Sequence, residues 1–367
     1  QTDWSGGAVP GLVTATVTTY DSATGVDSTT VGQFSLQETA GWSVTYANWT
    51  RRSLVTVSNS DTGQTDYQVR LQVSYDADMQ ADFSDLRFTN VSGTSISYWL
   101  QSYTASTSAV VWVKVPSLPT GDTDIYMYYG NASATSASSG EDTFILFDDF
   151  EDGTIDPAKW VETDQVGGNE IYESGGRLNF VRAANDTWDK AVYAVGTYAR
   201  ANLSFESEYT WVSNFTGGYD AIMYGWHDSG AGKSYTDLIY AYYNPGTGSA
   251  SSIAHAVYED GSGRSVPAGN YWNEGTQYEI RVRAKELGGA YYDYSTDGGS
   301  NWTNTYNSSH STESNFRPGW AFYSGTHAYD NARIRKWMDT EPASAFAAEQ
   351  SKYPASAVLT SNVFNSG

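Results

Sequence analysis

Short runs of alternating apolar and polar residues extend along almost the whole chain. Clear examples are residues 13–20, 53–58, 67–73, 110–115 and 278–283, which are rich in Val, Thr, Tyr and Ile. Because the side chains of a β-strand point alternately to the two faces of a sheet, this period predicts strands with one buried face. Clusters of Gly, Asp, Asn and Ser separate the runs and favour turns. The pattern therefore predicts an all-β fold of the sandwich type.

Residues 341–353 depart from this pattern because they are rich in Ala and carry Pro at the second position. Both features favour the start of a helix. Alternation around Phe346 also permits a final edge strand. Both interpretations stay open, and the strand is the one we favour.

Composition and turn signals divide the chain into four segments. Residues 1–40 form a Gly- and Thr-rich segment with one or two strands, too short to bury a core alone. Residues 41–142 form a first β-sandwich, and residues 143–350 form a larger one that holds most of the Trp and Tyr. Residues 351–367 form a strand-like tail. The sequence thus predicts two tandem β-sandwiches with strand-like extensions at both ends.

The net charge of the chain limits the kinds of partner that it can bind. It has 42 Asp and Glu against 20 Lys and Arg, a net charge of −22, and a surface of that sign repels nucleic acid and anionic membranes. No apolar run reaches the roughly 20 residues of a membrane-spanning helix. The chain has no Cys, so disulfides and Cys-ligated metals are excluded. Its richness in aromatic and β-branched residues indicates a folded protein.

Several features are typical of an exported protein. The chain begins with Gln1 rather than Met, as if a signal peptide had been removed. We therefore expect an extracellular or cell-surface location. Asn-x-Ser/Thr sites, which accept N-linked glycans where the source glycosylates, are frequent. They are Asn48, Asn90, Asn131, Asn185, Asn202, Asn214, Asn301 and Asn307.

Five stretches resemble a pair of domains found in many exported surface proteins. Residues 85–88, 111–119 and 125–131 are similar to a domain of unknown function that lies directly before a lectin-like module. Residues 147–153 resemble the opening of that module, a concanavalin A-like or LamG-like domain, and residues 329–336 resemble its closing strand. The resemblance implies that the second sandwich is a concanavalin A-like jelly roll, and it says little about activity.

Both ends of the chain hold what resembles part of a β unit. A β unit that lacks a strand has an open edge, which an extended tail with alternating apolar residues can fill. We therefore expect residues 355–367 to dock into the N-terminal region of a neighbouring copy, which builds a filament or tube if the contact does not close. The alternative is that the tail folds back on its own chain. The residues of this assembly strand are Val358, Leu359, Thr360, Val363 and Phe364.

Two clusters of acidic residues are candidate Ca²⁺ sites, because Ca²⁺ prefers several carboxylate and carbonyl oxygens. In the first, four acids stand close together where the second sandwich opens, and the resemblance to jelly-roll domains adds one from the closing strand. They are Asp148, Asp149, Glu151, Asp152 and Asp330. The second cluster is Asp76, Asp78, Asp82 and Asp85. Solvated surface acids are the alternative interpretation of both.

Two further patterns concern sugars. Ser295, Asp297, Gly299 and Trp302 have the spacing of an Asp-box, a stabilised β-hairpin without a catalytic role. Several aromatic residues could either stack on sugar rings or fill the core. They are Trp211, Tyr224, Trp226, Tyr291, Tyr292 and Tyr294.

No catalytic constellation is evident. A glycoside hydrolase needs two carboxylates at a suitable spacing, and Glu162 and Asp164 begin such a motif without completing it. We therefore expect no enzyme. The favoured function is a structural subunit of an extracellular filament, assembled by strand donation with Ca²⁺. The alternative is a carbohydrate-binding lectin or adhesin module with polysaccharide as its partner.

Overall fold

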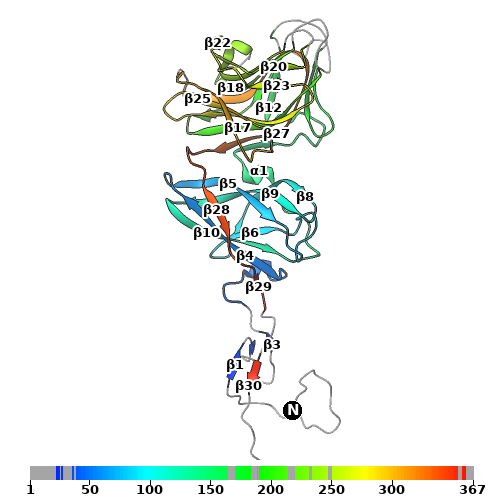
Figure 1. Cartoon of the computed structure of the whole chain (residues 1–367), viewed down its shortest axis with the longest axis vertical. Coiled ribbons are helices and arrows are strands. Elements are labelled where there is room, and N and C mark those ends of the chain that lie inside the picture. The colour runs from blue at the N-terminus through cyan, green and yellow to red at the C-terminus, as the bar shows by residue number, and fades with distance from the viewer. Residues whose placement is uncertain are drawn as a thin grey trace, which may run out of the picture.

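The structure is a computed structural model. It describes residues 22–24, 26–27, 35–36, 39–163, 170–182, 188, 190–213, 220–230, 234–246, 250–311, 313–353 and 358–360. Two β-sandwiches stack along the long axis, and the short terminal strands lie at one end (Figure 1). The helical elements are α1 (Gly140–Thr143), η1 (Val44–Tyr46) and η2 (Tyr235–Asp237). Within the described residues, no helix is long and apolar enough to cross a membrane. The predicted all-β fold is confirmed.

The first sandwich has two antiparallel sheets. One has the strand order β28-β4-β10-β6-β7, with β29 also pairing with β4, and the other has the order β5-β9-β8. Alternate apolar residues of both sheets, such as Val55, Leu71 and Val113, form the core. The strands are β4 (Arg51–Asn59), β5 (Gln64–Ser74), β6 (Arg87–Asn90), β7 (Ser95–Ile96), β8 (Tyr98–Thr104), β9 (Ser108–Leu118), β10 (Gly121–Tyr129), β28 (Ala343–Phe346) and β29 (Gln350–Ser351).

The last two strands of the first sandwich, β28 and β29, come after the second sandwich in the sequence. After the second sandwich ends, the chain returns and β28 extends the sheet along β4. The backbone N–H of Ala347 donates to Leu54 O at 2.8 Å. Residues 343–346 are therefore a strand, as favoured. They belong to the first sandwich, which differs from the predicted division at residue 350.

The second sandwich is built around one long strand, β27 (Asn315–Lys336). Its first part pairs in a front sheet, β12-β15-β27-β18-β19-β21-β22, and its second part in a back sheet, β13-β14-β27-β17-β24-β25-β26. The change of sheet occurs at Gly325, whose φ of 103° favours glycine. A Cβ atom there would also lie 2.8 Å from His327 Nε2.

The remaining strands of the second sandwich follow in chain order. They are β11 (Leu146–Asp148), β12 (Trp160–Thr163), β13 (Ile171–Glu173), β14 (Leu178–Arg182), β15 (Lys190–Ala194), β16 (Tyr198–Ala199), β17 (Leu203–Ser213), β18 (Ala221–Asp228), β19 (Leu238–Pro245), β20 (Ser252–Ala254), β21 (Ala256–Glu259), β22 (Ser262–Arg264), β23 (Tyr271–Asn273), β24 (Gln277–Ala284), β25 (Ala290–Ser295) and β26 (Thr303–Asn307). Both β11 and β16 pair with β27, and β20 pairs with β23.

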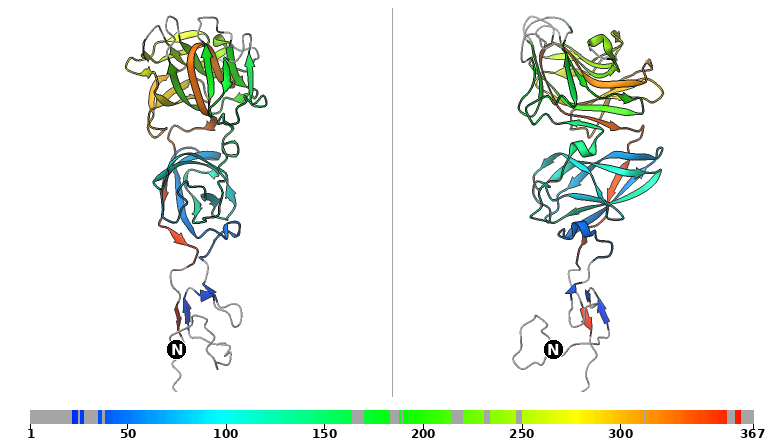
Figure 2. Two further views of the ribbon diagram at one scale, coloured as in Figure 1. Left: turned by 90° about the vertical axis from the view of Figure 1, so that its right-hand side faces the viewer. Right: turned by 180° about the vertical axis from the view of Figure 1, so that it is seen from behind.

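The back sheet of the second sandwich packs on the first sandwich through buried charges and aromatic rings. Arg333 lies between Glu206 and Glu279, with Nη2–Oε2 distances of 3.3 and 3.0 Å. Its guanidinium also stacks near the Trp99 and Trp112 rings of the first sandwich, 5.6 and 5.7 Å from their centroids. The interface with the first sandwich therefore covers part of the outer face of the back sheet. Figure 2 shows the second sandwich at the opposite end of the molecule from the short terminal strands.

The terminal strands pair with each other within the chain. Antiparallel pairing joins β1 (Ser22–Thr24) to β30 (Val358–Thr360), with Ala23 opposite Leu359, and β2 (Val26–Asp27) pairs with β3 (Ser35–Leu36). The tail therefore folds back on its own chain here, which is the alternative considered from the sequence. Val363 and Phe364, the other two residues of the predicted assembly strand, lie outside the described residues.

Candidate functional site

The outer face of the front sheet carries a cluster of half-exposed aromatic rings, which we call the aromatic face. Trp188 is central, with its ring centroid 5.2 Å from Tyr235, 6.0 Å from Tyr243 and 5.3 Å from Tyr323. Tyr258 extends the cluster, 5.1 Å from Tyr243. The rings pack over a small buried layer of Met223, Leu238, Ala241 and Ala321.

Small residues occupy the middle of this face. In one row across the sheet, Tyr193, Gly319, Gly225, Ala241 and Tyr258 stand opposite one another on consecutive strands. In this row the tyrosines stand at the two ends and residues with at most a methyl side chain lie between them. Apart from the half-exposed Tyr258, the residues of this row are buried, so the surrounding rings are the exposed part of the face.

A cation and an imidazole stand at one side of the same face. The guanidinium of Arg317 lies 5.9 Å from the ring centroid of Tyr193. Its Nε donates to Ser229 O at 3.1 Å and its Nη1 to Ala194 O at 2.9 Å, so it is held in place by backbone carbonyls. The ring of His227 lies 5.9 Å from Tyr193 and is fully buried. Arg317 is thus bonded to the backbone at this edge of the face, and His227 belongs to its buried part.

The aromatic residues singled out from the sequence lie elsewhere. Trp211, Tyr224, Trp226 and Tyr292 are at most 1% exposed and fill the core between the two sheets. A sugar-stacking role for these four is therefore wrong, and the alternative interpretation, core packing, is correct. Strand alternation is the signal that distinguishes the two sets: Tyr242 points into the core, and Tyr243, one residue later, points outward.

The acids that open the second sandwich do not form one cluster. Asp148 is buried; its Oδ2 accepts from Trp160 Nε1 at 2.6 Å and its Oδ1 from Phe150 N at 3.1 Å. Burial raises the pKa of this carboxyl. Asp152 is exposed and caps the turn to Thr154, and Asp149 is exposed as well. The side chain of Asp148 thus has a structural role in the absence of any ion.

Glu151 and Asp330, the other two predicted ligands, lie in a second acidic region. The Glu151 carboxylate packs against Gly176, where a Cβ would lie 2.4 Å from Oε1. Burial, together with the neighbouring Glu208 carboxylate, raises the pKa of Asp330 to about 7. Neighbouring ionised carboxylates repel one another. Their oxygens are ligands that a hard cation such as Ca²⁺ prefers. The five-residue metal set stays a prediction.

The second predicted acidic cluster also separates. Asp76 and Asp78 meet Glu349 from the returning segment, with one ligand atom of each within 4.8 Å of the others. Arg51 Nε already lies 2.7 Å from Asp78 and 3.1 Å from Glu349. The Asp85 carboxylate is buried and accepts backbone N–H groups, including that of Gly130 at 2.7 Å. Asp82 caps a local turn to Ser84.

The Asp-box spacing produces the expected hairpin between β25 and β26. Asp297 Oδ1 accepts from Ser295 Oγ at 2.7 Å and from Asn301 N at 2.8 Å. Hydrogen bonds from the Asn301 side chain, the Asn301 backbone and Ser295 lower the pKa of Asp297 to about 2. The tip of the hairpin faces the first sandwich, where Arg70 Nη2 donates to Gly298 O at 3.1 Å. This hairpin therefore supports the interface between the sandwiches.

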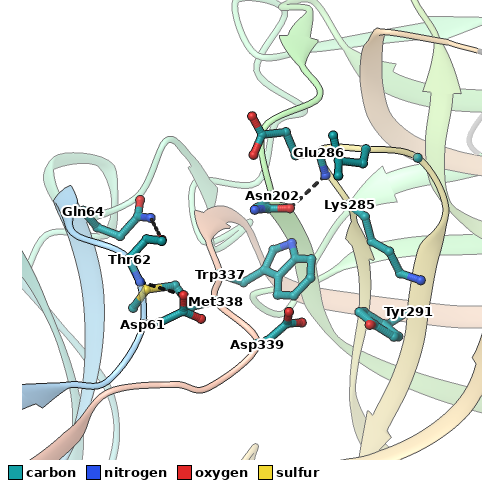
Figure 3. A pocket seen from close by; sticks show the side chains of 12 residues that line it. Asp61, Thr62, Gln64, Asn202, Lys285, Glu286, Tyr291, Trp337, Met338 and Asp339 are labelled. Carbon is teal, nitrogen blue, oxygen red and sulfur yellow. Dashed lines mark hydrogen bonds between the residues drawn. The ribbon is translucent and has the colours of Figure 1, made fainter. Parts of the chain in front are cut away.

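A polar cleft of about 380 Å³ lies at the junction of the two sandwiches. Figure 3 shows Asp61 and Gln64 on one side and Lys285, Tyr291 and Trp337 on the other. The Tyr291 ring is already in contact with the Lys285 ammonium, which lies 4.0 Å from its centroid. It is also in contact with the Trp337 ring. The ring is thus less open to a sugar than those of the aromatic face.

The predicted glycosylation sites differ in exposure. Asn48, Asn301 and Asn307 are exposed, whereas Asn90, Asn131 and Asn202 are half-buried. Asn185 and Asn214 lie outside the described residues. Occupancy of all eight sites stays a prediction.

Comparison with known proteins identifies one family in part of the chain. Residues 82–163 match the model of DUF2341, a domain of unknown function. The matched region includes most of the first sandwich and the first two strands of the second, so the predicted order of a domain of unknown function and a jelly-roll β-sandwich is confirmed. No curated protein matches the chain.

Similar solved structures cover about half of this chain and nearly all of their own. LamAcat from Zobellia galactanivorans is 12% identical, covers 54% of this chain and 100% of its own, and has a TM-score of 0.35. The carbohydrate-binding module CBM66 from Bacillus subtilis is 11% identical, with coverages of 50% and 99% and a TM-score of 0.31. The exoplasmic domain of VIP36, in a Ca²⁺- and Man3GlcNAc-bound form, is 10% identical, with coverages of 54% and 99% and a TM-score of 0.36.

Proposed function

We propose that this chain is a carbohydrate-binding surface protein that displays the second sandwich at the tip of a stalk. The observation that carries the proposal is the aromatic face, where Trp188, Tyr235, Tyr243 and Tyr323 stay half-exposed around a centre of small residues. Aromatic side chains with a polar edge suit ligands that are apolar on one face and hydroxylated at the rim, as sugar rings are. The proposed location is extracellular, and the proposed ligand is a polysaccharide.

Binding without hydrolysis is part of the proposal. Glycosidases use two facing carboxylates. The described outward positions at the centre of the front sheet are Gly225, Gly319, Ala241, Ala321 and Met223. These residues are buried under the aromatic rings and supply no proton donor.

A ring-deletion experiment tests this function. Trp188→Ala and Tyr243→Ala should each weaken binding of a polysaccharide found by glycan array, by roughly two- to tenfold, since an aromatic contact contributes about 0.5–1.5 kcal/mol. Tyr103→Ala is the matched control, because Tyr103 is 51% exposed but lies on the first sandwich. Equal binding by all three variants, or cleavage of the glycan by the wild type, would contradict the proposal.

Strand exchange between copies is a second candidate function. The antiparallel pairing of β1 with β30 shows that the tail fits the N-terminal strand, and the same pairing can form between two chains. Because both strands lie at one end of the molecule (Figure 1), a reciprocal exchange closes a two-fold pair, whereas a one-way exchange builds the predicted filament. Electron microscopy of the full chain and of a variant lacking residues 355–367 distinguishes filament, pair and single chain.

A structural Ca²⁺ ion completes the proposal. Glu151 lies where the second sandwich opens and Asp330 lies in its closing strand, so an ion held by both would join the two ends of the domain. Burial is the main cause that raises the pKa of Asp330 to about 7, and a bound cation would lower this pKa because it stabilises the ionised carboxylate. Chelation should then lower the melting temperature, and Ca²⁺ should restore it where Mg²⁺ does not.

A further inference from the structure

Glu173 is a buried carboxylate that has the carboxyl of Asp152 and the backbone N–H of Thr154 as its polar neighbours. It ends β13 with its side chain turned inward, and only 8% of its surface is exposed. Neither Oε1 nor Oε2 has a hydrogen-bond partner. An ionised carboxylate buried in this way costs several kcal/mol unless a partner compensates it. The sequence analysis did not select Glu173, because a lone Glu in a short strand carries no signal.

The neighbours of Glu173 increase this cost. Its carboxylate lies next to that of Asp152, and the negative charge of Asp148 repels it. Two ionised carboxylates have no proton to share, so neither can donate to the other. Burial, followed by the charge of Asp148, raises the pKa of Glu173 to about 7. The pKa of Asp152 is lowered instead, chiefly by the N–H and hydroxyl of Thr154.

Lys159, a base near this turn, already pairs with other carboxylates. Lys159 Nζ lies 2.8 Å from Glu141 Oε1 and 4.0 Å from Asp148 Oδ2. It therefore compensates Glu141 and, weakly, Asp148. The side chains described around Glu173 thus carry an excess of negative charge.

We propose that Glu173 and Asp152 bind a divalent cation of the Ca²⁺ type, with Asp148 adding charge behind them. Two carboxylates and the backbone carbonyls of the 148–154 turn supply the hard oxygens that Ca²⁺ prefers. The site has no His among its described neighbours and the chain has no Cys, so zinc is disfavoured. This inference is independent of sugar binding and concerns carboxylates other than those of Glu151 and Asp330.

Tb³⁺ provides a direct probe, since it replaces Ca²⁺ and luminesces when a nearby indole is excited. Trp160 is such an indole, because its Nε1 donates to Asp148. We expect Tb³⁺ luminescence with the full chain, competed by Ca²⁺. Glu173→Gln should weaken Tb³⁺ binding by at least about tenfold. Ca²⁺ should also raise the melting temperature of this variant by less than it raises that of the wild type.

Matched variants locate the ion. Asp78→Asn changes the separate Asp76–Asp78–Glu349 cluster and should leave the Trp-sensitised signal unchanged. Retention of the full signal in Glu173→Gln, with loss in Asp330→Asn, would place the ion at Glu151 and Asp330 and overturn the proposal. Absence of any signal in the wild type would overturn it as well, and Glu173 would then be a protonated carboxyl. Glu173→Gln preserves side-chain shape, so its stability without Ca²⁺ should match or exceed that of the wild type, which shows that it folds.

Discussion

At the scale of single residues, the most consequential positions are buried charges at the junction of the two sandwiches. Arg335 Nε lies 2.7 Å from Glu206 Oε1, and its Nη2 lies 2.7 Å from Glu341 Oε1, which comes from the returning segment. Arg333 approaches the other oxygen of Glu206. These charges are compensated because the segment of Arg333, Arg335 and Glu341 meets Glu206, which lies far from it in the sequence.

Glu206→Gln should destabilise the protein by about 3–5 kcal/mol at neutral pH, because it leaves two buried guanidiniums short of a partner. Burial raises the pKa of Glu206, but Arg335 and Arg333 outweigh it and hold the pKa at about 2, below the ordinary 4.5. A depressed pKa contributes stability above the unfolded value, and that stability is lost as pH falls from about 4.5 to about 2. Urea unfolding across this range should show the difference between variant and wild type shrinking. A difference independent of pH would contradict this.

Trp226 provides a test of the core assignment. It is fully buried and its Nε1 donates to Val282 O at 2.8 Å. Trp226→Ala should lower the free energy of unfolding by about 3–5 kcal/mol through the cavity it leaves. Calorimetry measures this loss, and a variant as stable as the wild type would be inconsistent with the core described.

At the scale of elements, the returning strand β28 decides how the first sandwich is completed. It covers the edge of β4, whose unpaired N–H and C=O groups would otherwise be open to other chains. Glu349, in the loop after β28, accepts from Tyr129 Oη at 2.7 Å. The first sandwich thus depends on residues that follow the second one.

Two truncations separate the roles of the tail segments. Removal of residues 342–367 should lower the melting temperature and promote aggregation, because it exposes β4. Removal of residues 354–367 takes away β30 alone and should leave the melting temperature of the sandwiches close to that of the full chain. Calorimetry and light scattering report both results; equal melting temperatures for the two truncations would rule out the role of β28.

At the scale of the whole molecule, the stacked sandwiches form an elongated unit with the aromatic face at one end and the paired terminal strands at the other (Figure 2). The interface places Trp112 between Arg333 and Arg335, with ring-to-guanidinium distances of 5.7 and 5.0 Å. Desolvated cation–π contacts of this kind contribute about 2 kcal/mol or less each. These contacts join the two sandwiches into one elongated unit.

Trp112→Ala should loosen the stalk without unfolding either sandwich, since the ring lies in the interface and outside the main cores. Small-angle X-ray scattering should show an elongated wild type and a broader range of dimensions for the variant. Calorimetry should show one transition splitting into two. An unchanged scattering curve would indicate that the remaining polar contacts, such as Lys336 Nζ with Thr65 O at 2.6 Å, hold the interface alone.

The sequence by itself determined the features that depend on neighbouring residues. Alternation predicted the strands, Asp-Gly steps predicted turns, and the Asp297 motif predicted its hairpin, because each depends on local geometry and hydrogen bonds. Tertiary structure decided the rest. Whether Tyr242 or Tyr243 faces solvent, which acid becomes buried as Glu173 does, and where β28 pairs all depend on contacts between distant segments. Pairing between distant segments leaves no local pattern to read, since it is set by which surfaces remain to be buried once the strands have formed.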